Sequence, residues 1–316
     1  MASFYCVNAN LLRNHYKKVS SGFKEWDQGS HAEEYTIFAS NIDEKLSIDE
    51  VSLSDGELYT LLTNKSGHGK NGTLVATINS TKSEDIINIL QKIPLSERLK
   101  VKEITLDMAK NMEAAVKSCF PNATLVTDRF HVVRLVQNAL QHLRVKLGWD
   151  ALDQQNKEIK SAKEQRIKYV QKTFANGDTP KQLLTRSRYI LAKNPENWTT
   201  NQQERAKILF ENYPKLKEVH EHVIEFRNIY QVNEKSNAKQ KLLDWMEKTP
   251  ELEVTEFNSV MHTIEYNFEQ ILNFFENRST NASAESFNAK LKLFRANLRG
   301  VRDKSFFLFR LMKLFA

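Results

Sequence analysis

Three acidic side chains at widely separated positions have the types and settings that phosphodiester chemistry requires. Asp49 and Asp107 each follow a short apolar run, at residues 46–48 and 104–106, and Glu285 begins a basic amphipathic stretch far downstream. Short apolar runs are typical of buried strands, and open α/β sheets place their chemistry at the carboxyl ends of strands. Two strand-end aspartates and a helical glutamate could together hold hard divalent cations against a phosphodiester. The pattern indicates a nucleic-acid phosphotransferase.

Each acid also has a structural alternative. An aspartate after a strand is often only a turn or a helix cap, and Asp107 could cap the helix that follows it. Glu50 directly follows Asp49, so the strand could present either acid, although its alternation favours Asp49. A helical glutamate such as Glu285 usually lies on the surface.

The elements that must position these acids can be read from apolar periodicity. Three apolar segments separated by turn-forming residues predict an antiparallel meander of strands at 45–53, 56–64 and 72–79. Further patterns predict, in order, a helix at 83–93, a strand at 101–106, a helix at 111–119, a strand at 123–127 and a helix at 130–147. This order predicts an α/β fold, an RNase H-like mixed sheet flanked by helices.

Composition changes at about residue 150, and strand-like segments vanish from there to residue 276. Thr179-Pro180, Thr199-Thr200 and Pro214 are typical helix starts, so we expect five or six helices in an all-α insertion. The predicted domains are a helical lead-in at 1–40, the first part of the catalytic domain at 41–150, the insertion at 151–276 and closing basic helices at 277–316. Trp149, Trp198 and Trp245 are expected in the core, although one could stack on a flipped base.

The closing helix separates apolar from polar residues. An apolar stripe at spacings of i, i+4, i+7 and i+11 is predicted to be buried, and it consists of Phe287, Leu291, Phe294 and Leu298. Glu285, Asn288 and Lys292 follow one another three and four residues apart on a polar stripe. A glutamate on that side of a packed helix could reach the strand ends while Lys292 faces a substrate.

The net charge of +7 is located in one part of the sequence. Residues 278–316 carry nine Lys or Arg and two acids, while the rest of the chain carries 37 of each sign. A basic surface beside a metal-binding carboxylate suits a polyphosphate, because Lys and Arg contacts with phosphate dominate affinity. The residues expected to bind DNA are Lys290, Lys292, Arg295, Arg299 and Arg302. The alternative is a solvated helix face, which is what charge runs usually are.

Bulk properties agree with this class. A length of 316 residues allows one large or two ordinary domains. The two cysteines, Cys6 and Cys119, fit a reducing cytosol and argue against a disulfide framework or a cysteine-rich zinc module. No signal peptide and no apolar run of membrane-spanning length is present in the sequence.

Several ordered motifs carry a resemblance to a known family. They are Phe-Pro-Asn-Ala at 120–123, Leu-Val-Thr-Asp-Arg-Phe-His-Val-Val at 125–133, the NASAESFNAKLK stretch and Arg-Gly-Val-Arg at 299–302. From about residue 26 onward the chain resembles a bacterial insertion-sequence transposase of the DDE superfamily, of the ISL-three and ISAon-one kind, distant relatives of the Mutator-like enzymes. The resemblance maps the catalytic triad onto Asp49, Asp107 and Glu285, and an Asp-x-x-His signature onto Asp128 and His131.

What the resemblance implies is a DNA transposase. Two Mg²⁺ or Mn²⁺ ions about 3.5–4 Å apart would be held by the triad, water would cleave the transposon ends, and the exposed 3′-hydroxyl would carry out strand transfer. Asp128, His131 and Asn288 are expected to orient the substrate or the ligands, although His131 could equally bond a nearby carboxylate. The alternative function is a catalytically inactive or domesticated DNA-binding protein with the same fold.

The expected partner is double-stranded DNA, at transposon ends and at the target, bound by a homo-oligomer. About forty residues precede the first predicted strand, and they hold one cysteine, Cys6. Transposases of this kind usually carry a zinc-binding and helix-turn-helix region there, and the resemblance implies that a separate companion protein supplies this base-reading region. The expected location is the bacterial cytoplasm, in association with the nucleoid and with no membrane.

Overall fold

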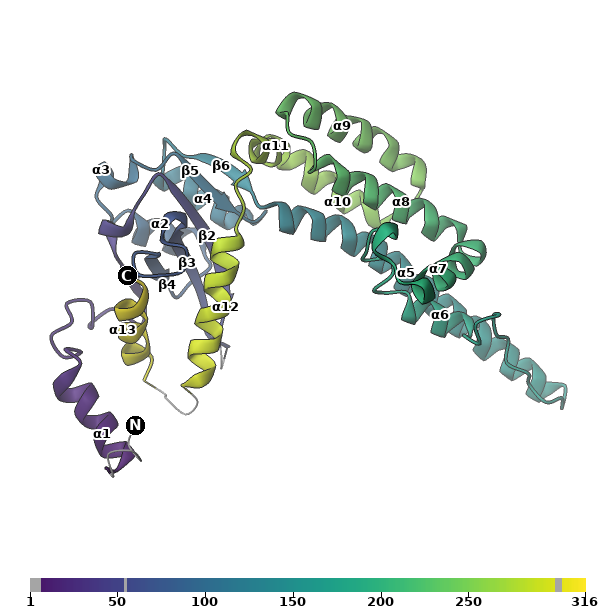
Figure 1. The fold of residues 1–316 in the computed structure, drawn as a ribbon, viewed down its shortest axis with the longest axis horizontal. Coiled ribbons are helices and arrows are strands. Elements are labelled where there is room, and N and C mark those ends of the chain that lie inside the picture. The colour runs from purple at the N-terminus through teal and green to yellow at the C-terminus, as the bar shows by residue number, and fades with distance from the viewer. Residues whose placement is uncertain (1–6, 54–55, 299–302) are drawn as a thin grey trace. The chain divides into compact units, whose positions relative to one another are not determined.

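The computed structural model describes residues 7–53, 56–298 and 303–316. The chain forms two compact units, shown in Figure 1. Unit 1 combines Met1–Asp128 with Ser279–Ala316, and unit 2 is Arg129–Arg278. The compositional change at about residue 150 lies inside α5 (Arg129–Glu164), the helix with which unit 2 begins.

Unit 1 is built on a six-stranded mixed sheet with the order β1-β4-β3-β2-β5-β6. The strands are β1 (Tyr35–Ile37), β2 (Lys45–Ser52), β3 (Leu58–Asn64), β4 (Leu74–Ile78), β5 (Glu103–Leu106) and β6 (Thr124–Thr127). β2, β3 and β4 form the predicted antiparallel meander, and β5 and β6 add to β2 in parallel. The prediction of a mixed α/β sheet of the RNase H-like kind is confirmed.

The first face of the sheet is apolar and is covered by α2 (Ser83–Leu90) and α4 (Lys110–Cys119). In β2 this face takes the even-numbered side chains, with Leu46 and Ile48 fully buried, because successive side chains of a strand point to opposite faces. Asp49 therefore belongs to the other face.

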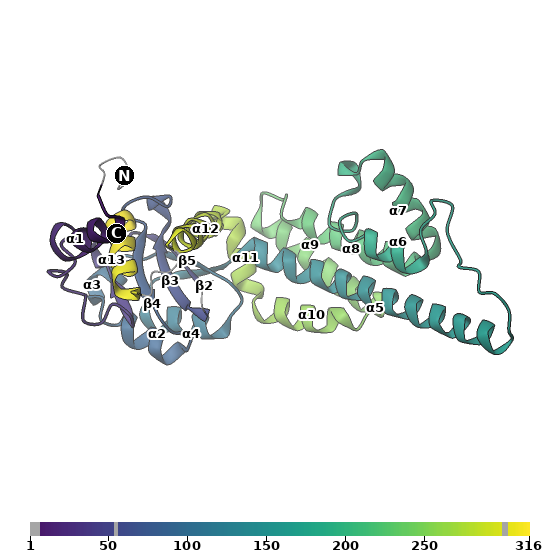
Figure 2. The same ribbon diagram turned by 90° about the horizontal axis from the view of Figure 1, so that it is seen from below.

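The second face is covered by α12 (Ala282–Asn297) and α13 (Lys304–Phe315), as Figure 2 shows. Phe287 and Leu291 of α12 are buried against it, and Phe294 and Leu298 pack beside them in part. The predicted apolar stripe of this helix is confirmed. The stripe covers only one half of the face, where Val51 and Leu61 supply apolar partners.

The N-terminal region contains more than the expected helices. α1 (Ala9–His15) continues into a short π-helical turn (Tyr16–Ser20), but β1 then pairs antiparallel with β4 as an edge strand. The sequence did not indicate β1, because three residues are too few for a periodic pattern. A short helix, α3 (Leu95–Arg98), was also missed.

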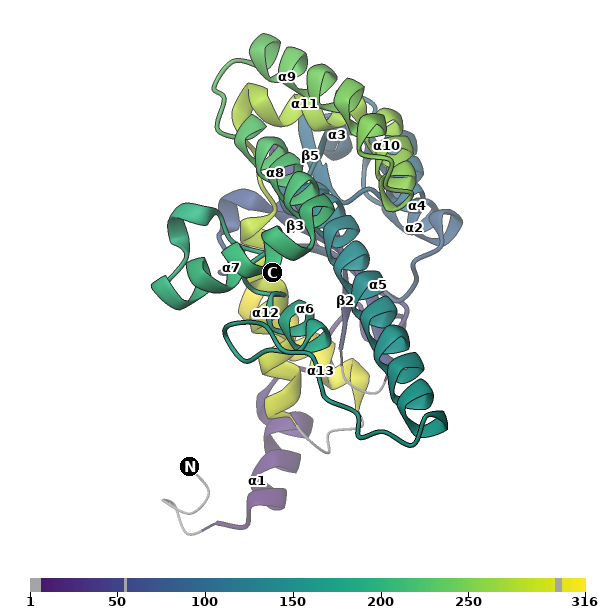
Figure 3. The same ribbon diagram turned by 90° about the vertical axis from the view of Figure 1, so that its right-hand side faces the viewer.

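Unit 2 is all-helical in the residues from 129 to 278, all of which the structure describes, and Figure 3 shows its helices from the side. After α5 the helices are α6 (Pro180–Arg186), α7 (Thr200–Asn212), α8 (Pro214–Ile229), α9 (Lys235–Lys248), α10 (Glu256–Tyr266) and α11 (Phe268–Asn277). Thr179 and Thr199 form capping boxes at α6 and α7, and Pro214 is at the first turn of α8. These predicted helix starts are confirmed.

The tryptophans of unit 2 differ in burial. Trp245 is fully buried and donates its indole N–H to the His222 carbonyl at 2.9 Å, and Trp198 is half-buried. Trp149 is 62% exposed, so its assignment to the core is wrong. It lies on the second half of the 36-residue α5. No helix among the described residues is both long and apolar enough to span a membrane.

Candidate active site

The sheet register brings Asp49 and Asp107 to the same level on neighbouring strands. Ser47 of β2 pairs with Thr105 of parallel β5, so two residues further along Asp49 stands opposite Asp107. Both side chains are half-buried and fall on the α12 face by alternation. Two carboxylates placed side by side at the end of a parallel strand pair are a suitable base for a cation site.

The two aspartates end their strands differently. Asp107 directly follows β5, and its Oδ1 accepts the Ala109 N–H at 2.8 Å in a tight turn. It does not cap α4, whose N-cap residue is Ala109. Asp49 is not at a strand end, contrary to the expectation, because β2 continues to Ser52 through its pairing with β3. Asp49 lies instead where the parallel partner β5 has ended.

α12 is connected to Asp49 through Asn288. The Asn288 side chain donates from Nδ2 to Asp49 Oδ2 at 2.7 Å, and the Glu50 backbone N–H donates to Asp49 Oδ1 at 2.9 Å. Glu285 is one turn before Asn288, so the two residues share a face of the helix. The Glu285 side chain is exposed. This face of α12 therefore contacts Asp49 through Asn288, whereas the carboxylate of Glu285 is exposed to solvent.

Asp49 and Asp107 are side by side, but the three acids do not form an assembled metal centre. Among the described residues no three acidic, histidine or cysteine side chains are grouped closely enough to hold a metal ion. The donor set nevertheless fits a hard divalent cation, because it consists of carboxylate and amide oxygens. Asn288 Oδ1 supports this fit, since it is buried beside Asp49 without a hydrogen-bond partner. A carboxylate of Glu285 would have to turn inward to join them.

Asp128 is at the same level on the third parallel strand. Leu106 pairs with Thr127, which sets Asp128 opposite Asp107, and the Asp128 N–H donates to the Leu106 carbonyl at 2.9 Å. Asp128 is 2% exposed, and its Oδ1 accepts the Asn281 backbone N–H at 3.3 Å. It thereby connects β6 to the start of α12.

Asn281 itself is unusual. It is the N-cap residue of α12, yet its side chain makes no capping hydrogen bond. The residue is 1% exposed, and both polar atoms of its amide are buried without a partner. Buried polar groups are normally hydrogen-bonded, so an unpaired amide beside the acids indicates a place for water, an ion or substrate.

Comparison with known proteins identifies the family of the chain. A sequence profile for a family described as transposases, of the DDE type and the ISL-three kind, matches residues 46–311. The chain belongs to the ISL-three family of DDE transposases. The chain is also 21% identical over 275 residues to the transposase for insertion sequence element IS1001 of Bordetella parapertussis. That match covers 86% of this chain and 61% of the relative, so the chain spans about three fifths of the relative's length.

The remaining predicted site residue of this transposase-family chain, His131, is on α5 at the beginning of unit 2. It is half-buried, and its ring meets Phe130 edge-on, with 5.5 Å between the ring centroids.

Sequence analysis missed a buried polar network on the sheet face that carries Asp107. Glu103, which shares its strand face with Asp107, accepts hydrogen bonds from Lys65 and Ser279, and Lys65 also donates to Thr105. Burial lowers the pKa of Lys65, an effect that Glu103 opposes. Burial raises the pKa of Glu103, but the bonds from Ser279 and Lys65 outweigh it and hold that pKa below its ordinary value. The signal for this network was the charged residue that begins β5.

The basic residues of the closing segment divide into different classes. Lys290 and Lys292 are exposed, and Lys290 Nζ donates to the Gly69 carbonyl at 3.1 Å. Arg299 and Arg302 lie outside the described residues.

Arg295 is 6% exposed and forms a two-point ion pair with Glu57, from Nε at 2.9 Å and from a terminal nitrogen at 2.8 Å. Its guanidinium also stacks over the Phe307 ring at 5.1 Å. Arg295 therefore fastens α12 to the residue before β3, and we withdraw its assignment to DNA binding. The partner was not predictable, since Glu57 is 238 positions away in sequence.

Proposed function

We propose that the chain is a DNA transposase that cleaves DNA at transposon ends and joins the ends to target DNA. The observation that carries the proposal is the register that sets Asp49 beside Asp107, with α12 connected to Asp49 through Asn288. Family membership supports DNA as the substrate. The match to the IS1001 transposase, which acts for an insertion sequence element, points the same way.

Asp49 and Asp107 would hold Mg²⁺ or Mn²⁺, with Glu285 of α12 as the third carboxylate. A divalent cation in such a site makes a bound water or hydroxyl a stronger nucleophile and stabilises the charge on the leaving oxygen. Asn288 holds the Asp49 carboxylate in a fixed orientation through its Nδ2, and its unpaired Oδ1 is available to a water molecule or to the cation. Asp128 orients the start of α12, and Asn281 presents its unpaired amide close to the same acids.

Of the five basic residues predicted to contact DNA from the closing segment, Lys290 and Lys292 are the described ones that remain candidates. Both are exposed on α12, on the turns that follow Asn288. Phosphate contacts of this kind position DNA but do not read its sequence. We propose that these lysines guide the backbone of the DNA toward the acids.

The test is cleavage of DNA that carries the ends of the chain's own element. Asp49→Asn, Asp107→Asn and Glu285→Gln each keep the shape of the side chain but lose the charge that a hard cation needs. We expect each variant to lose cleavage by at least about 1000-fold, equivalent to about 4 kcal/mol, with Mg²⁺ or Mn²⁺ present. Thermal unfolding should stay close to that of the wild type.

Glu50→Gln is the matched control, because Glu50 is next to Asp49 but points to the opposite face of β2. It should retain cleavage. Near-normal cleavage by Glu285→Gln would remove the third ligand from the assignment. Metal-independent binding without any cleavage by the wild type would favour the alternative, an inactive DNA-binding protein.

A further inference from the structure

Charge is segregated within unit 2, although its overall balance hides this. Residues 129–193 carry 14 basic and five acidic side chains, a net charge of +9, whereas residues 194–278 carry ten basic and 15 acidic ones, a net charge of −5. The excess of positive charge thus follows α5, the segment after it and α6. Such separation within one helical unit is typical of a surface that meets an anionic partner.

The basic residues of α5 and α6 that matter are Arg144, Lys181 and Arg188. In the part of the chain that the structure describes, none of the three has an acidic partner within ion-pair distance. Arg144 instead donates to two neutral oxygens, Gln141 Oε1 at 2.8 Å and the Leu184 carbonyl at 3.1 Å. Burial and the nearby positive charge of Arg188 lower the pKa of Arg144. Because the guanidinium groups of Arg144 and Arg188 repel each other and no acid among the described residues neutralises them, an anion would bind favourably beside them.

Lysines elsewhere in the unit show the contrast. On α8, Lys215 lies 2.9 Å from Glu218 and Lys217 lies 3.8 Å from Glu221. Their charges are balanced locally, as is usual on a solvated helix face.

Arg144 and Lys181 also line a pocket of about 180 Å³ between α5 and α6. Gly148 and Trp149 form part of its wall. Trp149 is 62% exposed, and Tyr189, over which Arg188 stacks at 5.8 Å, is 69% exposed. Large exposed aromatic side chains among unpaired cations are costly on a surface that only meets water, and they suit contacts with nucleic acid.

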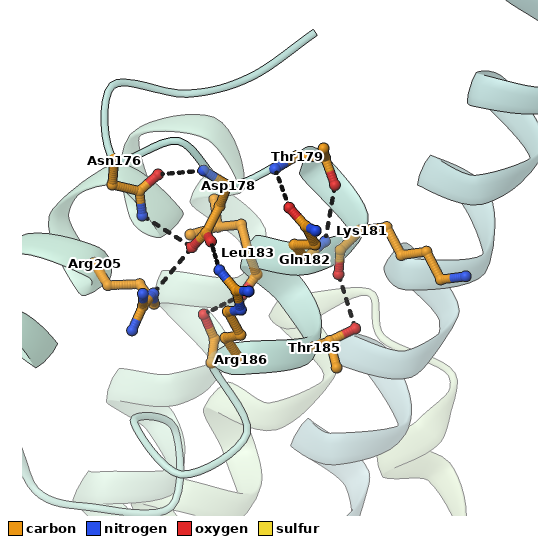
Figure 4. Close-up of polar contacts among 10 residues, drawn as sticks. Asn176, Asp178, Thr179, Lys181, Gln182, Leu183, Thr185, Arg186 and Arg205 are labelled. Carbon is orange, nitrogen blue, oxygen red and sulfur yellow. Dashed lines mark hydrogen bonds and ion pairs between the residues drawn. The ribbon is translucent and has the colours of Figure 1, made fainter. Parts of the chain in front are cut away.

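A buried acid fixes the position of this surface, as Figure 4 shows. Asp178 is fully buried, and its carboxylate is bonded by Arg186, by Arg205 at 3.1 Å and by Asn176 at 2.9 Å. These bonds hold the segment before α6 against α6 and α7. Lys181 extends away from the Asp178 cluster in the figure, so its charge is not used there.

We propose that the face formed by Arg144, Lys181 and Arg188, with Trp149 and Tyr189, binds the phosphate backbone of double-stranded DNA. It is a second DNA surface, on unit 2 and separate from the lysines of α12. The inference rests on the proposed function for the identity of the ligand. It does not depend on the carboxylates of unit 1, because binding of phosphates by cations requires no catalysis.

The experiment measures the affinity of the full-length chain for duplex DNA over a range of salt concentrations. Lys181→Gln with Arg188→Gln removes two charges from the face, and Lys215→Gln with Lys217→Gln removes two from α8 as the control. The slope of log K against log salt should become shallower by about 1.8 in the first variant, at about 0.9 per phosphate contact. It should not change in the control.

Tryptophan fluorescence supplies a second readout that does not depend on the charge variants. Duplex DNA should quench the wild-type emission, Trp149→Phe should lose most of the quenching, and Trp198→Phe should keep it. Equal slopes for both double variants, or quenching that survives Trp149→Phe, would overturn the inference. So would a slope change seen with single-stranded DNA alone, or a wild type that does not bind duplex DNA.

Failure of this inference and failure of the proposed function are distinguishable. Metal-dependent cleavage together with equal slopes would reject the unit 2 face and keep the transposase assignment. Suppose instead that only the Lys181→Gln with Arg188→Gln variant shows weaker salt-dependent binding, and that the wild type does not cleave DNA. That result would keep the unit 2 face and reject the transposase assignment.

Discussion

The buried amides near the acids of unit 1 differ from the buried acid of unit 2. In unit 1, Asn281 and Asn288 are buried beside Asp128 and Asp49 with amide atoms that have no partner. In unit 2, the buried carboxylate of Asp178 is bonded on all sides. A bonded buried group stabilises the fold, whereas an unbonded one costs stability and persists where a ligand uses it. We therefore propose that the unbonded amides of unit 1 serve the site, whereas Asp178 maintains the structure of unit 2.

The largest expected effect on stability is at Asp178. Asp178→Asn removes the charge that Arg186 and Arg205 share and leaves the two cations facing each other. Breaking a buried pair costs about 3–5 kcal/mol, and because both arginines are partly exposed we expect about 2–3 kcal/mol here. Urea unfolding monitored by circular dichroism would measure this. Asp244→Asn on α9, where the aspartate is exposed, is the control and should change little.

His222 provides a second effect on stability, which appears only as the pH falls below 6.5. Burial lowers its pKa from 6.5 to about 4, although Glu225 opposes the shift. Between pH 6.5 and 4 the unfolded chain therefore takes up a proton that the folded chain refuses. The free energy of unfolding should fall by up to about 1.4 kcal/mol per pH unit over that window, and this group should add no further loss below it.

Unfolding curves at pH 7.5, 6 and 5 would show this slope. His222→Gln should flatten it, although His220 leaves a residual slope because burial lowers its pKa too. His262→Gln is the control, since that side chain is 83% exposed. A slope that survives His222→Gln in full would mean that the buried imidazole is not the titrating group.

A third prediction tests Asn288, one of the buried amides that lack a hydrogen-bond partner. Asn288→Ala removes an amide whose Oδ1 has no partner, so we expect stability to change by less than about 1 kcal/mol. Cleavage should nevertheless drop by at least about tenfold, because Asp49 loses the group that orients it. A large loss of stability with normal cleavage would place Asn288 with Asp178 as a structural residue.

The smallest expected effect concerns Gly148. It lies inside α5, and a Cβ built on it would meet nothing within 4 Å. Gly148→Ala should therefore stabilise the helix by about 0.5–1 kcal/mol. Because Gly148 lines the pocket beside Trp149, the same change should weaken duplex binding. Stabilisation without any change in binding would show that the pocket is not used.

The sequence predicted what depends on local patterns. The helix starts at Thr179 and Thr199 follow from capping residues a few positions away, and the strands of the meander follow from alternation. The order of motifs also gave the acidic triad, whose three positions remain a proposal.

What the sequence did not predict depends on distant partners. In sequence, Arg295 looks like any surface arginine, and only the fold places Glu57 beside it. Lys65 likewise looks like a turn lysine, and only the fold brings it to Glu103, which Ser279 also bonds. Trp149 was assigned to the core from residue type alone, yet it is 62% exposed. Burial and pairing across a fold are not encoded within a short window.

The order of the units along the chain has a consequence for synthesis. The strands of unit 1 are complete at Thr127. The helix α12, which covers part of the second face of the sheet, is translated only after Arg278. At about 5–20 residues per second, the ribosome needs roughly 8–30 s for the intervening unit. During that time the sheet emerges without its cover. The Asp49 side chain therefore has no contact from α12 until translation has passed Asn288.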